Sequence, residues 1–372
     1  MTEEATTYDA SHIEVLEGWK AVRKRPGMYV GSTGERGVRN MVFDVADRPV
    51  NDVLAGRART VGITLLSDGG IRVADDGPGV DGAGLEDLLT RFQTGARSPE
   101  GRREVALSFC GVGPGVVNAL SRRMTAEVRL DGVRRVQEYA RGVAVTPLTE
   151  AGTANGTGTA IAFWPDPDIF GAAECSFDAL VERFRDLAFL HRGLEVSLTD
   201  ERGPGEPRSE RFLFPGGVRE FVRFLDGGTV DSVPADTIAF ECEAPRMAGA
   251  MEVAFRWTGS HEERVRGFAN GLPTLEGTHL EGFRAGLAAA LTAYARAHRE
   301  PTANDITLDR IGVGLTAVVS VKLDHPRFEG ATWGVLANST VRDCVRQGVR
   351  EHLSRWLEEH PERAAALLDR MR

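Results

Sequence analysis

Apolar and polar positions repeat with helical and strand periods along this chain. Between residues 39 and 54, apolar side chains at helical spacings predict a helix with one face on a core: Val42, Val45, Val53 and Leu54. The other face carries Asp44, Asp47, Arg48, Asn51 and Asp52. Because Pro49 lacks a backbone donor, we expect it to disturb this helix at a cost of about 3 kcal/mol. Arg48 follows Asp44 by one turn, a spacing at which an ion pair would occupy that carboxylate.

Short alternating runs predict strands in both halves of the chain. Residues 61–66 and 71–74 are joined by Ser67-Asp-Gly-Gly, a hairpin signal. Further strands are expected at 125–130, 135–139, 159–163, 194–198, 236–241, 251–257 and 315–323. Helices are expected at 15–25, 85–92, 177–187, 218–225, 279–298 and 340–358, with a glycine-bearing turn entering a helix at 108–120. Residues 28–34 and 94–104 are predicted loops, the second a candidate lid.

The order of these elements sets the expected fold class and domains. Helices alternate irregularly with hairpin strands in both halves, which predicts α+β layers. A composition shift at Gly203-Pro-Gly-Glu-Pro marks a domain boundary. We therefore expect an amino-terminal arm at residues 1–14, a first domain at 15–208 and a second domain at 209–372.

Composition and charge narrow the classes of partner. The net charge of −9 and the pI near 5.5 exclude a general electrostatic footprint for nucleic acid. The four cysteines show no CxxC spacing, so neither a zinc site nor a disulfide framework is indicated, and a reducing cytoplasm fits. The acidic start is unlike a signal peptide, and no apolar run reaches membrane length. We expect a cytoplasmic protein with no membrane partner.

Several motifs occur in an order that resembles the amino-terminal region of DNA gyrase B. They are Ala21-Val-Arg-Lys-Arg-Pro-Gly-Met-Tyr-Val-Gly-Ser-Thr, Asp75-Asp-Gly-Pro-Gly, Gly111-Val-Gly with Val117-Asn-Ala-Leu-Ser, Gly156-Thr-Gly-Thr, Phe163-Trp-Pro and Gly277-Thr-His-Leu-Glu-Gly-Phe-Arg. The resemblance implies a GHKL (Bergerat) ATPase-like α/β sandwich followed by a transducer domain of ribosomal-protein-S5-like α+β fold. The TOPRIM domain, which carries the cleavage metal in that family, is not expected in this sequence.

The resemblance also assigns roles to residues of a nucleotide pocket. Asp75 would accept from the exocyclic amine of adenine, and Thr159 would support the same edge through water; the alternative for Asp75 is an Asx turn before Gly77. Gly79 would border the base. Gly111 and Gly113 would lie near the phosphates, at a helix start where backbone donors favour anions.

Tyr8 is the arm residue from which a protein partner is expected. By the resemblance it would reach from the arm into the nucleotide site of a partner subunit; alternatively it anchors the arm on its own domain. A homodimer is therefore implied, and a gyrase subunit is the other expected partner. DNA strand passage by this chain alone is not expected.

The helix at 39–54 departs from the family at the positions that carry chemistry. Where the family has a glutamate base and a magnesium-binding asparagine, this sequence has Asp44 and Arg48. Aspartate is shorter by one methylene, and general-base catalysis depends on hydrogen-bond reach. A guanidinium has no acceptor and stays protonated, so Arg48 cannot coordinate Mg²⁺. Asp47, on the same polar face, is counted with the pocket.

Other departures fall on the phosphate lid, the transducer and the pocket mouth. Leu107-Ser-Phe-Cys replaces the glycine-rich lid motif, which puts Phe109 and Cys110 where close backbone approach to phosphate is needed. Trp333 stands at the transducer lysine, and Lys322 lies beyond Pro326. The two arginines of the family pocket mouth are replaced by Pro78 and Val136.

These departures predict that Mg-dependent ATP hydrolysis, the activity that drives the family's topoisomerase reaction, is lost. The degenerate pocket then binds nucleotide without hydrolysis and without Mg²⁺, or holds another small molecule. The second case includes a shape-driven enzyme such as a cyclase and a ligand-sequestering resistance protein. A gyrase-interacting module and a slow functional ATPase subunit are the remaining alternatives. Apart from a nucleotide bound without Mg²⁺, the residues specify no cofactor.

Overall fold

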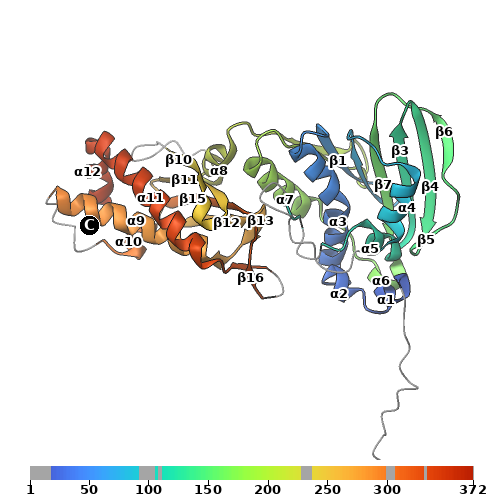
Figure 1. Ribbon diagram of the computed structural model, residues 1–372, viewed down its shortest axis with the longest axis horizontal. Coiled ribbons are helices and arrows are strands. Elements are labelled where there is room, and N and C mark those ends of the chain that lie inside the picture. Colours follow the sequence, from blue (N-terminus) through green and yellow to red (C-terminus); the bar gives the residue numbers. More distant parts are fainter. Residues whose placement is uncertain are drawn as a thin grey trace, which may run out of the picture.

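The computed structural model describes residues 18–91, 105–107, 111–227, 237–298, 306–330 and 333–371. Figure 1 shows two lobes side by side, the first reaching Phe212 and the second beginning at Gly217. Both lobes combine sheets with helices, which confirms the predicted α+β class. Within the described ranges, no helix has the length and apolar character that crossing a bilayer requires.

The first lobe is built on one large sheet. Its helices are α1 (Trp19–Lys24), α2 (Gly27–Val30), α3 (Glu35–Leu54), α4 (Gly82–Thr90), α5 (Pro114–Ala119), α6 (Pro167–Phe170) and α7 (Phe177–Leu190). Its strands are β1 (Thr60–Leu65), β2 (Ile71–Asp75), β3 (Ser121–Leu130), β4 (Val133–Ala140), β5 (Val143–Ala144), β6 (Thr149–Thr153), β7 (Gly158–Pro165), β8 (Glu195–Asp200) and β9 (Arg208–Phe212). The sheet order is β5-β4-β3-β7-β2-β1-β8-β9, with β6 on β4.

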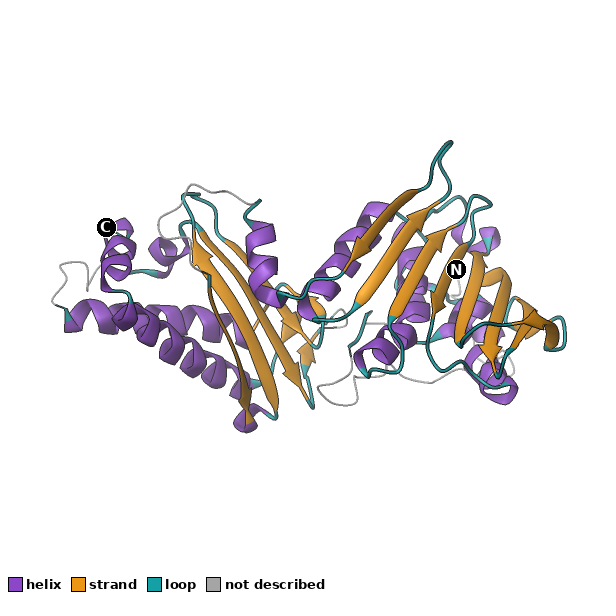
Figure 2. Cartoon of the chain, turned by 90° about the horizontal axis from the view of Figure 1, so that it is seen from above, coloured by secondary structure: helices purple, strands orange, loops and turns teal. Residues whose placement is uncertain are grey.

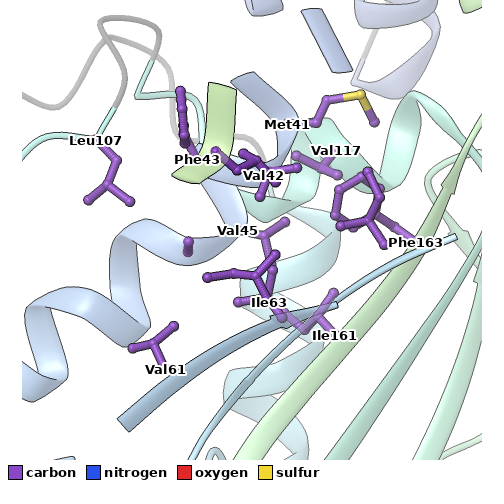
Figure 3. Close-up of a cluster of buried hydrophobic side chains, with 14 of the residues drawn as sticks. Met41, Val42, Phe43, Val45, Val61, Ile63, Leu107, Val117, Ile161 and Phe163 are labelled. Atoms are coloured by element: carbon purple, nitrogen blue, oxygen red, sulfur yellow. The ribbon is translucent and has the colours of Figure 1, made fainter. Parts of the chain in front are cut away.

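The core of the first lobe lies between this sheet and α3. The predicted hairpin is confirmed, since β1 and β2 pair antiparallel from Val61↔Asp75 to Leu65↔Ile71. Alternate residues of β1 are buried, as expected for a strand with one face on a core. Figure 3 shows Val42 and Val45 of α3 gathered with Ile63 of β1 and Ile161 of β7. The apolar face of α3 therefore fixes where its polar face points.

Two local expectations were wrong. We expected Pro49 to disturb the helix, but α3 runs without interruption from Glu35 to Leu54. Pro49 is buried, and we attribute the continuity to tertiary packing that outweighs the local cost of proline. Residues 28–34 were predicted as a loop, yet the first three of them continue the short helix α2, which closes at Gly31 with φ 74°.

The second lobe carries a sheet in the order β10-β11-β15-β12-β13 and a small sheet β14-β17-β16. Its strands are β10 (Ile238–Ala244), β11 (Gly249–Trp257), β12 (Arg264–Ala269), β13 (Leu272–Thr274), β14 (Glu276–Gly277), β15 (Leu315–Leu323), β16 (Phe328–Glu329) and β17 (Val335–Leu336). Its helices are α8 (Gly217–Leu225), α9 (Thr278–Ala297), α10 (Leu308–Gly312), α11 (Ser339–Glu359) and α12 (Pro361–Arg370), with a 3₁₀ turn η2 (Pro245–Met247).

Both faces of the β10–β13 sheet are covered. Val253 and Phe255 of β11 pack in one cluster with α9 and α11, whereas Ala254 packs on the opposite face with α8. Figure 2 shows α9 and α11 together along one side of the sheet. The buried run in β11 therefore reflects a central strand with helices on either side.

The connection between the lobes lies near the expected boundary at 208/209. β9 begins at Arg208 and pairs with β8 up to Phe212, so these residues belong with the first sheet. α8 follows at Gly217 and packs on the second sheet. We propose that the division between the two domains falls between Phe212 and Gly217.

Candidate functional site

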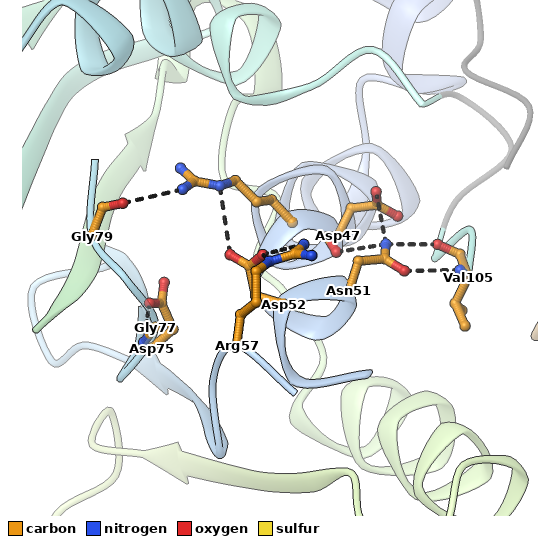
Figure 4. A network of polar contacts seen from close by, with 9 residues as sticks. Asp47, Asn51, Asp52, Arg57, Asp75, Gly77, Gly79 and Val105 are labelled. Carbon is orange, nitrogen blue, oxygen red and sulfur yellow. Dashed lines mark hydrogen bonds and ion pairs between the residues drawn. The ribbon is translucent and has the colours of Figure 1, made fainter. Parts of the chain in front are cut away.

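The polar face of α3 holds an arginine network at the edge of the first sheet. Arg48 places Nη2 3.5 Å from the Gly79 carbonyl oxygen and Nε 3.7 Å from Asp52 Oδ2. Arg57 donates Nε and Nη2 to Asp52 Oδ1 at 2.8 and 2.6 Å. The Arg48 guanidinium thus bridges α3 and the loop after β2, at Asp52 and Gly79, which Figure 4 labels. Its positive charge therefore lies across the space between these two elements.

The expected ion pair between Arg48 and Asp44 was wrong. Asp52 also lies four residues from Arg48, and the guanidinium turns toward it. The Asp44 side chain instead points into the protein, where the residue is only 3% exposed. Both partners satisfy the helical spacing, so the choice between them depends on which side of α3 the first-lobe core covers.

Asp75 closes β2 and accepts two backbone hydrogen bonds. Its Oδ1 accepts from Gly77 N at 2.8 Å and from Thr159 N at 3.3 Å, and the first contact is the Asx turn considered as the alternative. Burial raises the pKa of this carboxyl, opposed by the two backbone donors and by the charge of Arg48. A Cβ at Gly158 would lie 2.2 Å from the Asp75 carbonyl oxygen, so glycine is required there.

Arg48, Asp75 and Thr159 line one pocket, together with six apolar side chains: Val45, Pro49, Val73, Leu88, Pro114 and Ile161. The space open to a water-sized sphere is about 10 Å³, roughly one water molecule. A purine or any similar ring would require movement of the Arg48 or Pro49 side of the wall.

Other residues assigned to this pocket lie around it. Gly79 accepts the Arg48 hydrogen bond, and Gly113 caps α5 with φ 76°, next to the lining residue Pro114. Gly111, at φ 53°, precedes it in the same turn. Pro78 is exposed beside Gly79, whereas Val136 is half-buried in β4. Neither Pro78 nor Val136 is among the lining residues.

Asp47 and Asn51 bind a neighbouring segment of the chain. Asn51 exchanges hydrogen bonds with Val105, as donor to its carbonyl at 3.0 Å and as acceptor from its N–H at 2.9 Å. Asp47 Oδ1 accepts from Leu107 N at 3.1 Å. These contacts hold residues 105–107, which follow the expected lid, against α3. Tyr8, Phe109, Cys110 and the lid at 94–104 lie outside the described residues.

Trp333 lies apart from this pocket, in the second lobe. Its ring stacks on Phe328 with centroids 5.4 Å apart, and its backbone has φ 54°. It lines a different pocket, between the lobes, with Arg39 and Phe43. The structure therefore unites Arg48, Asp75 and Thr159 but leaves Trp333 outside their pocket.

Sequence reasoning missed two arginines near these sites. Arg129 of β3 donates to the Asp75 carbonyl oxygen at 3.0 Å. Arg183 of α7 is half-buried and donates to the carbonyl oxygens of Ala106, Leu107 and Gly271. Arginine makes up most of the basic residues, so no local pattern distinguishes these two from surface arginines.

The Arg48 side chain itself cannot be a ligand of a magnesium ion. Mg²⁺ takes oxygen ligands in octahedral geometry, whereas Arg48 offers only donors and a positive charge. Within the described ranges, no group of three or more histidine, cysteine, aspartate or glutamate side chains is placed to hold a metal. We derive no metal-dependent step from this arrangement.

Comparisons with known proteins agree along the chain. A family model described as DNA gyrase B matches residues 217–372. The DNA gyrase B protein of Streptomyces coelicolor is 41% identical over 98% of this chain and 57% of its own length. The novobiocin-sensitive DNA gyrase B protein of Streptomyces niveus is 39% identical over 97% of this chain and 58% of its own. The chain thus spans less than two thirds of these curated relatives.

A solved structure covers the same region. The 43K ATPase domain of Thermus thermophilus gyrase B, in complex with an aminocoumarin, superposes with a TM-score of 0.77. It is 32% identical, with 96% of this chain and 94% of that chain covered. Since sequence and fold agree over both lobes, the chain belongs to the DNA gyrase B family.

Proposed function

We propose that this chain is a gyrase-B-like protein whose ATP-type pocket binds a small molecule and does not act as a Mg-dependent ATPase. The observation that carries the proposal is the Arg48 guanidinium between Asp52 and Gly79. By resemblance, this is the position of the metal-binding asparagine. A guanidinium there supplies positive charge but no ligand oxygen.

Two further features support loss of hydrolysis. Trp333 replaces the lysine expected to reach the terminal phosphate, and it lies in a different pocket. Loss of a single transition-state donor lowers a rate by about 10²–10³. Loss of both the metal and the lysine removes the two positive groups that would neutralise the developing phosphate charge.

The pocket keeps features of a ligand site. Asp75 and Thr159 offer a polar edge, and the other walls are largely apolar. The Thermus thermophilus relative is in complex with an aminocoumarin. This favours a ligand of that kind here, which the chain would sequester. Nucleotide binding without hydrolysis is the alternative for the same pocket, with Arg48 taking the place of the metal charge.

The first experiment measures ATP turnover by the purified chain with Mg²⁺. We expect a rate no higher than that of Asp44→Asn, because hydrolysis has lost its metal and its phosphate-binding lysine. Turnover that requires Mg²⁺ and disappears in Asp44→Asn would refute the proposal. The combined variant Arg48→Asn, Pro49→Ala, Trp333→Lys tests the reasoning in reverse, since it returns the family residues and should gain measurable turnover.

The second experiment identifies the ligand class by thermal stabilisation. We expect an aminocoumarin to raise the unfolding temperature more than an ATP analogue does, and Asp75→Asn to abolish that rise. Arg346→Gln, on the exposed part of α11, is the matched control and should leave it unchanged. Micromolar binding of ATP with no aminocoumarin effect would select the nucleotide alternative.

Protein partners follow from the family and are part of the proposal. A homodimer and a complex with a gyrase subunit are the two expected assemblies. Light scattering of the purified chain tests the first, and co-purification with gyrase subunits from a bacterial host tests the second.

A further inference from the structure

A second pocket, of about 290 Å³, lies between the two lobes. α3 contributes Arg39 and Phe43, and α7 contributes Arg183. From the second lobe, Leu272 of β13 and Trp333 complete the wall. Neither Asp75 nor Thr159 lines it, so it is separate from the ATP-type pocket.

Positive charge exceeds negative charge around this pocket. Its lining includes Arg36, Arg39, Arg183 and Arg266 against Glu182 and Asp186. Arg266 is paired with Asp186 across the lobes, and Arg183 is occupied by the carbonyl oxygens of Ala106, Leu107 and Gly271. These residues form fixed walls whose charges or donors already have partners.

Arg39 differs from the paired arginines of this pocket. It makes no hydrogen bond or ion pair with another residue of the described part of the chain, and it is only half-exposed on α3. Arg36, one turn before it, donates a hydrogen bond from one guanidinium nitrogen to the Gly31 carbonyl oxygen. A guanidinium beside apolar walls favours an anionic partner, because its planar donors match a carboxylate or sulfonate.

The second lobe contributes an aromatic side chain, Trp333, to the wall of this pocket. Trp333 and Phe328 stack with ring planes 8° apart. Trp333 has φ 54°, a backbone region that bulky residues seldom adopt, and its ring rests against Phe328. Phe43 and Leu272 add apolar surface. Such a surface favours a planar ring, for which stacking geometry contributes beyond buried area.

We propose that this interdomain pocket binds a small planar aromatic anion, a carboxylate or sulfonate on one or two fused rings, with its charge on Arg39 and its ring beside Trp333. A pocket of this volume lies at the lower end of those that bind small molecules, which fits a ligand of this size. The inference does not depend on what the ATP-type pocket binds. A bound anion would contact both lobes and hold them together.

The test measures binding of naphthalene-2-sulfonate to the full chain by titration calorimetry. We expect saturable binding that Arg39→Gln weakens roughly tenfold to a hundredfold, the value of one charge-assisted contact. Arg39→Lys should recover part of the affinity, and Trp333→Leu should weaken binding about fivefold through lost stacking. Arg346→Gln on α11 is the matched arginine control and should bind like the wild type. Unfolding temperatures of all variants verify that they fold.

Three results would overturn the proposal. The first is absence of saturable binding. The second is equal affinity for the neutral analogue 2-naphthol, which would show that Arg39 recognises no charge. The third is a loss of binding in Asp75→Asn while Arg39→Gln binds like the wild type. That result would place the anion in the ATP-type pocket.

Discussion

At the residue scale, burial and charge decide what each polar group can do. Arg48 and Arg183 are both arginines in the first lobe, yet one spans a pocket edge and the other is enclosed by backbone carbonyl oxygens. Burial lowers the pKa of Arg183 to about 10, so it stays charged at neutral pH. The family resemblance alone assigns no role to Arg183, because its role depends on contacts distant in sequence.

His279 gives a pH-dependent prediction at this scale. It is fully buried at the start of α9, its Nε2 lies 2.8 Å from Thr274 Oγ1, and burial lowers its pKa to about 4. Below the unfolded pKa near 6.5, the unfolded chain takes up a proton that the folded chain does not, so stability falls as pH falls. Between pH 7.5 and 4.5, we expect the free energy of unfolding to fall by roughly 2–3 kcal/mol less in His279→Gln than in the wild type.

Urea unfolding at the two pH values measures this difference. Other histidines such as His191, whose pKa burial lowers to about 3, are common to both proteins and cancel in the comparison. Equal pH dependence in both proteins would contradict the assignment of His279 as a buried neutral group.

At the element scale, α3 is the helix that both pockets share. One face packs on the first-lobe core, Arg48 and Pro49 line the ATP-type pocket, and Arg39 and Phe43 line the interdomain pocket. A change in its register would therefore alter both pockets together. Pro49 keeps its place in this helix although it cannot donate to the Val45 carbonyl oxygen.

The prediction for α3 is that Pro49→Ala stabilises the protein. Alanine is favoured over proline by about 3 kcal/mol inside a helix, whereas the ring methylenes lost from burial cost about 0.8 kcal/mol each. We expect a net gain of about 1 kcal/mol in the free energy of unfolding. Pro114→Ala, at the first position of α5, is the control and should bring no gain, since proline suits that position. Clear destabilisation by Pro49→Ala would mean that the ring packs better than this balance allows.

At the scale of the whole molecule, an aromatic cluster joins the lobes. Phe189 of α7 is 1% exposed and stacks with Phe214 at 3.7 Å and with Phe221 of α8 at 4.7 Å between ring centroids. The ion pair of Arg192 with Glu252 crosses the same junction at 2.5 Å. Because this interface is apolar and packed, we infer that the lobes unfold as one unit.

Phe189→Ala tests this coupling. We expect a loss of about 3–5 kcal/mol, as for a buried aromatic ring removed from a core, and a single calorimetric transition that separates into two. Phe224→Ala is the matched control, because Phe224 is 43% exposed beside the same cluster and should cost much less. One sharp transition in both variants would show that the lobes are coupled by other contacts.

Much of the fold was predictable where local periodicity is strong. The β1–β2 hairpin, α7, α9, α11 and the long strands β11 and β15 all occur near their expected ranges. The strands β5, β6, β9, β12, β13, β14, β16 and β17 were not expected, since two to six residues carry little periodic signal. Among the expected pocket residues, Arg48, Asp75 and Thr159 lie together, whereas Trp333 does not.

The sequence by itself determined the family, the α+β class and the residue types at each motif, because motif order and side-chain periodicity are properties of the chain alone. Only the tertiary structure decided that Arg48 turns to Asp52 and away from Asp44, that α3 continues through Pro49, and that Arg39 and Trp333 line one pocket between the lobes. Each of these outcomes depends on contacts between residues far apart in sequence, and local pattern carries no information about them.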